Sequence, residues 1–159
     1  MNTKQKQVPA LPHFVGKSVY LKPAGPDDIF NAQVWVNKYD PQILWPTPVP
    51  PLSPSEAADR FKITDRSINE QIYAIARCED DLLVGTVGYR HLNMQNRSAE
   101  LSVIIDPDEQ RKGHGAEAVR ILTRYLFKQR GLNKMYVEVS EANHAAMAFF
   151  EKRFPFRRD

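Results

Sequence analysis

The chain has 159 residues, of which 42% are hydrophobic and 26% are charged, and these values are typical of one soluble globular domain. No run approaches the roughly 20 apolar residues of a membrane span, and a net charge of +3 is too small to argue for nucleic acid binding. Cys78 is the only cysteine, which excludes an internal disulfide and favours the cytoplasm. The polar N-terminus has no apolar segment of a signal peptide.

The sequence pattern of the first 69 residues predicts an arm, one strand and two helices. In chain order, we expect a flexible N-terminal arm over residues 1–16, a strand over 17–23, a helix over 26–39, a proline-rich loop over 40–54 and a helix over 53–69. Pro26 suits a first helical turn, and the aspartates after it suit the positive end of the helix dipole. Ser53 or Ser55 is the expected N-cap of the second helix.

The second part predicts three consecutive strands and then an alternation of helix and strand. We expect strands over 71–77, 82–92 and 99–105, a helix over 113–130, a strand over 134–140 and a helix over 143–154. The order β-αα-βββ-α-β-α predicts an α/β (α+β) domain over 17–159. Its central sheet is expected to be mostly antiparallel and flanked by helices, with one β-α-β crossover near the end.

The stretch QRKGHG (110–115) lies between a predicted strand and a predicted helix. A helix start leaves backbone N–H groups without partners and carries a partial positive charge, so it can bind an anion. Glycines let the backbone approach a phosphate closely, and Arg111 and Lys112 add positive charge. The alternative is a tight turn that binds nothing. The stretch lacks the Lys-Ser/Thr of the nucleotide P-loop and the third glycine of the dinucleotide fingerprint.

QRKGHG resembles the Gln/Arg-x-x-Gly-x-Gly/Ala motif of the GNAT acetyltransferase superfamily, with Gln110, Gly113 and Gly115 at the named positions. The resemblance extends from about residue 17 to 153. It includes VYLKPAGPDDIFNAQVWVN, LLVGTVGYRHL, AELSVIIDPDEQRKGHGAEAV and YVEVSEANHAAMAFFEK. The chain is most similar to the branch with ribosomal-protein N-terminal acetyltransferases and spermidine acetyltransferases. The resemblance implies a GNAT-like fold and a single N-acetyltransferase domain over 17–159.

The family's ligand is acetyl-coenzyme A, and the resemblance implies where it binds; no metal is expected. Its pyrophosphate would lie on the backbone N–H groups of Arg111, Lys112, Gly113, His114, Gly115 and Ala116, next to Gln110. Its pantetheine arm would run beside Val103, Ile104 and Ile105. Asn143 would also reach the coenzyme, a role that is compatible with capping the last helix.

Acetyl transfer to an amine needs a base, because an alkyl ammonium has no lone pair at neutral pH. Glu100 is the first candidate, directly or through a water, since AEL matches the family's acidic position. The alternative is an exposed strand carboxylate or a salt-bridge partner. His91 is the second candidate, although a lone histidine there is more often structural. We expect His114 to pack or to point to solvent, and Glu138 to line the substrate side of its strand.

Aromatic residues around the first helix and the proline-rich loop suggest an acceptor site. Trp35, Tyr39 and Trp45 bracket this region, which shapes the acceptor site in the family. Aromatic rings can pack on an amine or its alkyl stem. The alternative is that these three residues anchor the core or the loop.

The chain departs from the family pattern in two places. Many members carry a tyrosine seven residues after the asparagine, as the acid for the thiolate. This chain has Phe150 there, which the resemblance implies would line the coenzyme site but which donates no proton. The family's EKLGF is replaced by EKRFPF (151–156), and the usual final strand is missing or displaced. A truncated chain, a sheet completed by another route and pairing with a second subunit in a homodimer are the alternatives.

The sequence therefore predicts a cytoplasmic N-acetyltransferase that uses acetyl-coenzyme A and a primary amine. The acceptor is a protein N-terminus, a polyamine or an amino-bearing small molecule. The rival hypothesis is a coenzyme A-binding module of the same fold with weak or lost catalysis. We expect no nucleic acid partner, since the chain has no interleaved aromatic and basic surface motif. We expect no membrane partner, since it has no apolar run of spanning length.

Overall fold

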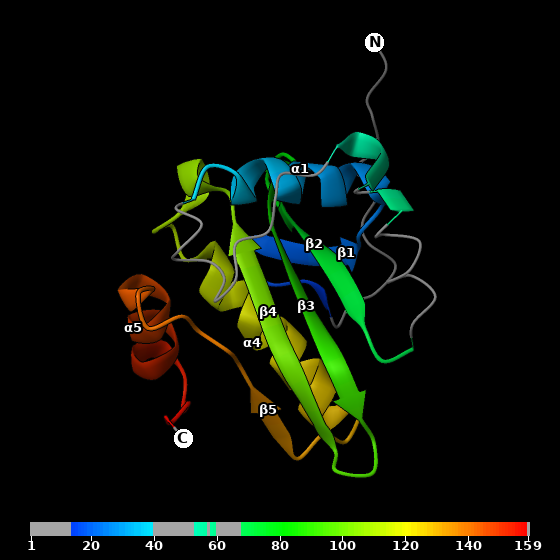
Figure 1. Cartoon of the computed structure of the whole chain (residues 1–159), viewed down its shortest axis with the longest axis vertical. Coiled ribbons are helices and arrows are strands. Elements are labelled where there is room, and N and C mark those ends of the chain that lie inside the picture. Colours follow the sequence, from blue (N-terminus) through cyan, green and yellow to red (C-terminus); the bar gives the residue numbers. More distant parts are fainter. Residues whose placement is uncertain (1–13, 40–52, 57, 60–67, 159) are drawn as a thin grey trace.

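The computed structural model describes residues 14–39, 53–56, 58–59 and 68–158, which build one five-stranded sheet with helices packed against it (Figure 1). The strands are β1 (Val19–Pro23), β2 (Gln71–Arg77), β3 (Leu83–Asn93), β4 (Ser98–Ile105) and β5 (Lys134–Tyr136). They follow one another across the sheet in chain order; β1 to β4 are antiparallel, and β5 is parallel to β4. The predicted mixed, mostly antiparallel sheet is confirmed.

The helices cover opposite faces of this sheet. Their bounds are α1 (Pro26–Val36), the 3-10 helix η2 (Pro107–Glu109), α4 (His114–Lys128) and α5 (His144–Arg153). Strand side chains alternate between faces, so neighbouring residues of β2 belong to different cores. Ile75 packs in the cluster that includes α4, whereas Ala74 packs with Ile29 of α1. The α1 face and the α4 face of the sheet are named accordingly below.

The larger core lies on the α4 face. Its buried residues from α4 include Ala118, Val119, Leu122 and Leu126, each without exposed surface, because they recur at helical spacing on one side of the helix. Phe14 lies in the same core, with its ring centroid 5.2 Å from that of Tyr73. Phe14 falls in the expected N-terminal arm of 1–16, so the packed domain includes at least this part of the arm. Residues 1–13 lie outside the described residues.

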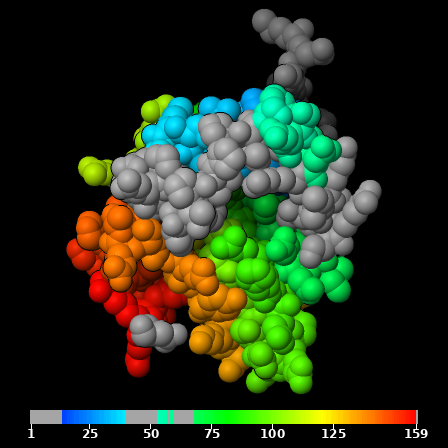
Figure 2. All heavy atoms as spheres, in the orientation of Figure 1, coloured from blue at the N-terminus to red at the C-terminus, as the bar shows by residue number. Residues whose placement is uncertain are grey.

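The predicted elements match the structure closely, with one large difference. The strand expected over 134–140 ends at Tyr136, and the chain then turns away from β4 towards α5 (Figure 1). In the space-filling view, the orange segment after β5 lies between red α5 and the green strands (Figure 2). Residues 154–158 after α5 form no strand, so the usual final strand of the family is missing from this part of the chain.

The proline-rich loop and the second helix can be compared only in part. Residues 40–52 and 60–67 lie outside the described residues, whereas 54–56 and 58–59 are helical. The Ser53 hydroxyl accepts a hydrogen bond from the Glu56 amide at 3.3 Å, and the Glu56 carboxylate accepts one from the Ser53 amide at 2.7 Å. This reciprocal pair is a capping box, and it identifies Ser53 as the N-cap.

Candidate active site

The turn between β4 and α4 contains two residues in the left-handed backbone region. Gly113, the N-cap of α4, has φ +85°, and Arg111 has φ +63°. A Cβ atom added at Gly113 would meet nothing within 4 Å. Gly113 is therefore needed for its backbone conformation, which glycine adopts without strain. The surface beside it is open and carries the exposed residues Arg111 and Lys112.

Gly115 has a different role from Gly113. A Cβ atom on Gly115 would lie 3.2 Å from Cγ1 of Ile105 and 3.8 Å from the ring of Phe149. Gly115 therefore allows the first turn of α4 to pack closely on β4. The expectation that both glycines serve the approach of a phosphate needs correction, because the hydrogen of Gly115 that faces β4 points into packed protein.

The N-terminus of α4 has no side-chain cap among the described residues. The Gly113 carbonyl accepts the first intrahelical bond from the Glu117 amide at 3.1 Å. The preceding amides, including those of Gly115 and Ala116, belong to the set that a helix leaves without internal partners. The ammonium of Lys112, the residue before Gly113, pairs with Glu109 at 3.1 Å.

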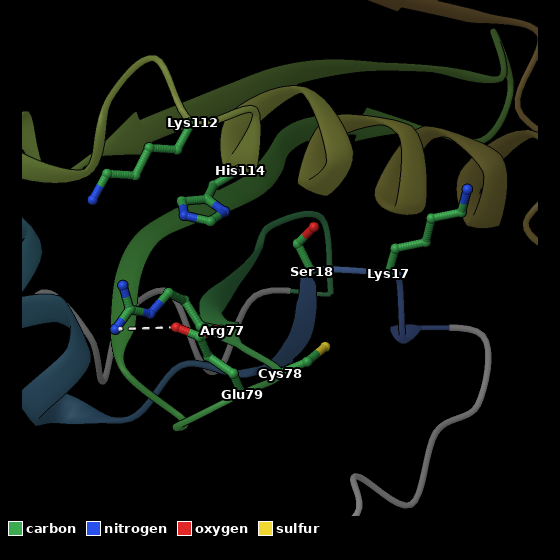
Figure 3. A pocket seen from close by; sticks show the side chains of 7 residues that line it. All are labelled: Lys17, Ser18, Arg77, Cys78, Glu79, Lys112 and His114. Carbon is green, nitrogen blue, oxygen red and sulfur yellow. Dashed lines mark ion pairs between the residues drawn. The ribbon is translucent and has the colours of Figure 1, made fainter.

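His114 points away from this turn into a separate pocket. The residue is 8% exposed, and neither ring nitrogen makes a hydrogen bond, although Nε2 lies 3.6 Å from Oε2 of Glu109. The pocket measures about 500 Å³ and is shown in Figure 3. It is lined by Lys17, Ser18, Arg77, Cys78, Glu79, Lys112 and His114. Of the two expectations for His114, packing is confirmed and exposure to solvent is wrong.

β4 has an open edge beyond β5. β5 pairs with β4 only from Ser98 to Glu100, and β4 continues to Ile105. The Asp106 amide donates to the carbonyl of Val84 in β3 at 2.9 Å. Because the bonding direction alternates along an antiparallel ladder, Val103 and Ile105 direct their backbone groups away from β3, towards this open edge. Of the three residues expected beside the pantetheine arm, Val103 and Ile105 thus face this edge, whereas Ile104 directs its backbone groups to β3.

Tyr39 closes the far end of the open edge. Its hydroxyl donates to the carbonyl of Ile105 at 2.5 Å and accepts a hydrogen bond from the side chain of Gln110. Burial raises the pKa of Tyr39, so the hydroxyl remains a donor at neutral pH. Gln110, the first residue of the glycine motif, thus positions Tyr39. Sequence reasoning missed this network, because no local pattern links residues so far apart in the chain.

Glu100 lies at the last pair of the β4–β5 ladder, opposite Tyr136. It is 2% exposed, so the expectation of an exposed carboxylate is wrong. Its Oε1 lies 2.5 Å from a guanidinium nitrogen of Arg90, and its Oε2 lies 2.9 Å from Nδ1 of His91. Burial raises the pKa of Glu100, but Arg90 and then His91 outweigh that effect and hold the pKa below its usual value. Glu100 is therefore a salt-bridge partner, the other alternative left by the sequence.

The backbone of β3 directs His91 to Glu100. Arg90 pairs directly across from Glu100, but the register breaks between Arg90 and Asn93. His91 lies in this break with φ +52°, a conformation that histidine adopts more often than most residues. Arg90 is a residue of the candidate site that sequence reasoning missed, although its place opposite Glu100 could be read from a correct strand pairing.

The remaining candidates are spread over three parts of the fold. Trp35 is 6% exposed on the buried side of α1, as a core anchor. Glu138 is exposed and lies beyond the end of β5, so its placement on a strand is wrong, although it is close enough to raise the pKa of Arg90. The Asn143 side chain caps α5, accepting from the Ala146 amide at 3.0 Å. Trp45 lies outside the described residues.

Phe150 belongs to the core on the α4 face. It is 5% exposed, and its ring centroid lies 5.0 Å from that of Phe149 and 5.3 Å from that of Phe156. The expectation that Phe150 lines the coenzyme site needs correction, because the side chain is enclosed by other aromatic rings. The phenylalanines of the departing EKRFPF segment complete this cluster.

The described residues hold neither a cluster of metal ligands nor a membrane-spanning helix. Among them, no group of three or more histidine, cysteine, aspartate or glutamate side chains is arranged to bind a metal ion. No helix in the described ranges has both the length and the apolar composition needed to cross a membrane.

Comparison with known proteins identifies a family. The family model of the acetyltransferase (GNAT) domain matches residues 19–153, which is most of the chain. A spermidine N(1)-acetyltransferase of Vibrio cholerae is 33% identical over 70 residues, covering 44% of this chain and 40% of that relative. The match therefore spans less than half the length of this curated relative.

Solved structures share the fold. The crystal structure of spermidine N-acetyltransferase from Vibrio cholerae in complex with CoA and spermine has a TM-score of 0.74 at 22% identity, covering 85% of this chain and 79% of that chain. The dodecameric structure of the Vibrio cholerae enzyme in an intermediate state has a TM-score of 0.69 at 22% identity, covering 85% and 77%.

Proposed function

This chain belongs to the GNAT acetyltransferase family, and we propose that it moves an acetyl group from acetyl-coenzyme A to a primary amine. The observation that carries the proposal is the open edge of β4, which leads from Glu100 at the end of the β4–β5 pairing to the uncapped N-terminus of α4. A ligand with amides at one end and a pyrophosphate at the other suits this path, because strand backbone groups can bind the amides and helix N–H groups can bind the pyrophosphate.

The coenzyme would bind along this path. The N–H groups at the start of α4, with Arg111 and Lys112 beside them, would hold the pyrophosphate. Val103 and the amide of Ile105 would bind the pantetheine amides, while the Ile105 carbonyl stays with Tyr39. The side-chain amide nitrogen of Asn143 would reach the coenzyme, because the cap of α5 uses only the side-chain oxygen.

The acyl group would then lie near Glu100, where β5 leaves β4. The acceptor amine must lose a proton to attack the acyl carbon, and the Glu100–His91 pair is the group of suitable chemistry at that point. Backbone N–H groups at the divergence of the strands would stabilise the developing oxyanion. Phe150 supplies no proton, and the leaving thiolate, with a pKa near 8.5 in a free thiol, departs without one.

The acceptor would approach from the α1 face, because Glu100 pairs across the sheet with Arg90 on that side. Spermidine and spermine are the first acceptors to test, since the structural neighbour from Vibrio cholerae was solved with spermine. A protein N-terminus and an amino-bearing small molecule are the other acceptor classes. We also propose a cytoplasmic location, on the single cysteine, and a homo-oligomer, on the dodecameric neighbour.

A coenzyme A-binding module without catalysis is the second candidate, favoured by the phenylalanine at position 150. One experiment separates the two. Thiol release from acetyl-coenzyme A is measured with spermidine, spermine, N-terminal peptides and amino sugars, alongside the shift in melting temperature caused by the coenzyme. We expect a shift and amine-dependent thiol release; a shift without release to any amine supports the binding module, and no shift rejects both.

A further inference from the structure

We propose that His91 and Glu100 form a dyad in which Nε2 of His91 takes the proton of the acceptor amine and Glu100 positions the imidazole through Nδ1. This inference rests on the proposed acetyl transfer and changes the role of Glu100 from base to positioning residue. His91 is the catalytic residue of the pair, since it would touch the amine.

Both carboxylate oxygens of Glu100 already have a hydrogen-bond partner. One carboxylate oxygen accepts from Arg90 and the other from His91, and the residue is 2% exposed. These two partners also keep the pKa of Glu100 below its ordinary value. A buried carboxylate that accepts two hydrogen bonds and has a lowered pKa is a weak proton acceptor at neutral pH.

His91 has the opposite properties. Its side chain is 63% exposed although Nδ1 is bound to Glu100, and Nε2, on the other side of the ring, is directed away from that carboxylate. A neutral imidazole that donates from Nδ1 has its lone pair on Nε2. The bond to Glu100 therefore selects the tautomer that a general base needs, and the carboxylate stabilises the imidazolium that forms.

The irregular backbone of β3 allows the hydrogen bond between His91 and Glu100. A regular β3 would place His91 on the face opposite Arg90 and Glu100, because neighbouring strand residues alternate. The break in register after Arg90 and the φ of +52° at His91 return the ring to the side of Glu100. Left-handed backbone at a residue other than glycine costs free energy, so it is a feature that function can explain.

The surrounding charges determine how protons move. Arg90 faces Glu100, and Glu138 and Glu70 lie close enough to Arg90 to raise its pKa. The hydrogen bond to Glu100 raises the pKa of Arg90 most, so Arg90 stays charged and neutralises Glu100 in part. Arg90 positions the dyad and takes no part in proton transfer.

Every proton and electron pair in the transfer has a destination. His91 Nε2 takes one proton from the ammonium, and the freed lone pair forms the new C–N bond. The C–S bond breaks, and its electron pair leaves with the sulfur, which takes a proton from solvent. The amide nitrogen gives up its second proton to solvent, and the imidazolium returns its proton to solvent through its exposed edge.

The tautomer can be tested without any turnover. Nitrogen-15 NMR of the imidazoles in the free wild-type protein should show the Nδ1–H tautomer for His91, assigned with His91→Asn. The opposite tautomer, with the proton on Nε2, overturns the dyad whatever the protein catalyses. If the Nδ1–H form is found but the wild type acetylates no amine, the proposed function fails, and the role of His91 as base fails with it.

Measurements of kcat distinguish His91 as the base from Glu100 as the positioning residue. His91→Asn keeps a donor for Glu100 and suits the left-handed backbone, but it accepts no proton, so kcat should fall by roughly 10²–10⁴-fold at neutral pH. Added imidazole should restore part of this loss, and the coenzyme-induced melting shift should not change. The matched control, His144→Asn, changes an exposed histidine at the start of α5 and should keep wild-type kcat.

Glu100→Gln tests whether the carboxylate acts through His91. It should lower kcat in the wild type and alter its pH profile, but add no further loss in the His91→Asn background, because groups that act as a unit are not additive. Near-wild-type kcat in His91→Asn, with a large loss in Glu100→Gln, would make Glu100 the base and overturn the proposal.

Discussion

Tyr39, just beyond the end of α1, donates its hydroxyl to the backbone carbonyl of Ile105, the last residue of β4, at 2.5 Å. The ammonium of Lys38 supports the same junction, 3.7 Å from Asp106 and 3.4 Å from Asp108. The helix on the proposed acceptor face is thus attached to the strand that leads to the proposed coenzyme site. This relationship makes Tyr39 a link between the two ligands as well as a part of the fold.

Tyr39→Phe should weaken coenzyme binding. The change removes one hydrogen bond to Ile105 and leaves Gln110 without its partner, so the free energy of unfolding should fall by about 1 kcal/mol. Isothermal titration with coenzyme A measures the affinity, and urea unfolding measures the stability. Tyr20→Phe is the matched control, because Tyr20 donates to Asp81 at 2.9 Å away from the open edge. Equal coenzyme affinity in the two variants would contradict the role given to Tyr39.

The stability of Gly113 variants should depend on how well the new residue adopts a positive φ and not on the size of its side chain. The alanine side chain of Gly113→Ala fits the open space, but its φ of +85° should lower the free energy of unfolding by about 1–2 kcal/mol. Gly113→Asn should be more stable than Gly113→Ala, since asparagine tolerates this region better. Thermal unfolding of the two variants decides the question. The reverse order would mean that steric contacts, rather than φ, determine the residue.

Gly115→Ala should destabilise the protein through contact with Ile105. The added methyl would lie 3.2 Å from Cγ1 of Ile105, so α4 or the isoleucine must shift. Ile105→Ala removes the contact and should cost less stability in the Gly115→Ala background than in the wild type. A double-mutant cycle on urea unfolding measures this coupling, and strict additivity would show that Gly115 is required for another reason.

Phe150→Tyr should lower stability without raising turnover. The ring lies in the core among Phe149, Phe154 and Phe156, and a buried hydroxyl without a partner costs about 1–3 kcal/mol. Melting temperature and kcat are measured on the same variant. A higher kcat at an unchanged melting temperature would place the new hydroxyl beside the sulfur and restore the family's acid.

Glu100 should contribute pH-dependent stability with a defined sign. Its pKa is lowered in the folded protein from an ordinary 4.5, so the stabilisation is present above about pH 4.5 and is lost as the pH falls through the lower folded value. The stability difference between wild type and Glu100→Gln should therefore shrink on acidification. Urea unfolding from pH 7 to pH 3 tests this, with the exposed Glu151→Gln as control. A difference that grows towards low pH would reverse the assigned sign.

The sequence by itself predicted most of the described helices and strands, and it pointed to the turn before α4 as the candidate coenzyme site. β2 lies where alternation predicts it, at 71–77, and α4 begins directly after Gly113, where the glycines predict a helix start. These features depend on side chains a few residues apart, since periods of 2.0 and 3.6 residues are local properties of the backbone. The mostly antiparallel sheet followed from the order and length of the elements.

Only the tertiary structure decided which distant residues meet. The bond of Tyr39 to Ile105, the contact of Gly115 with Ile105, the burial of Phe150 and the pairing of Glu100 with Arg90 and His91 all join separate elements. Each depends on strand register and helix packing, and a register shift of one residue moves a side chain to the other face. The break in β3 at His91 is such a departure from the regular alternation that the sequence alone predicts, and only the paired strands reveal it.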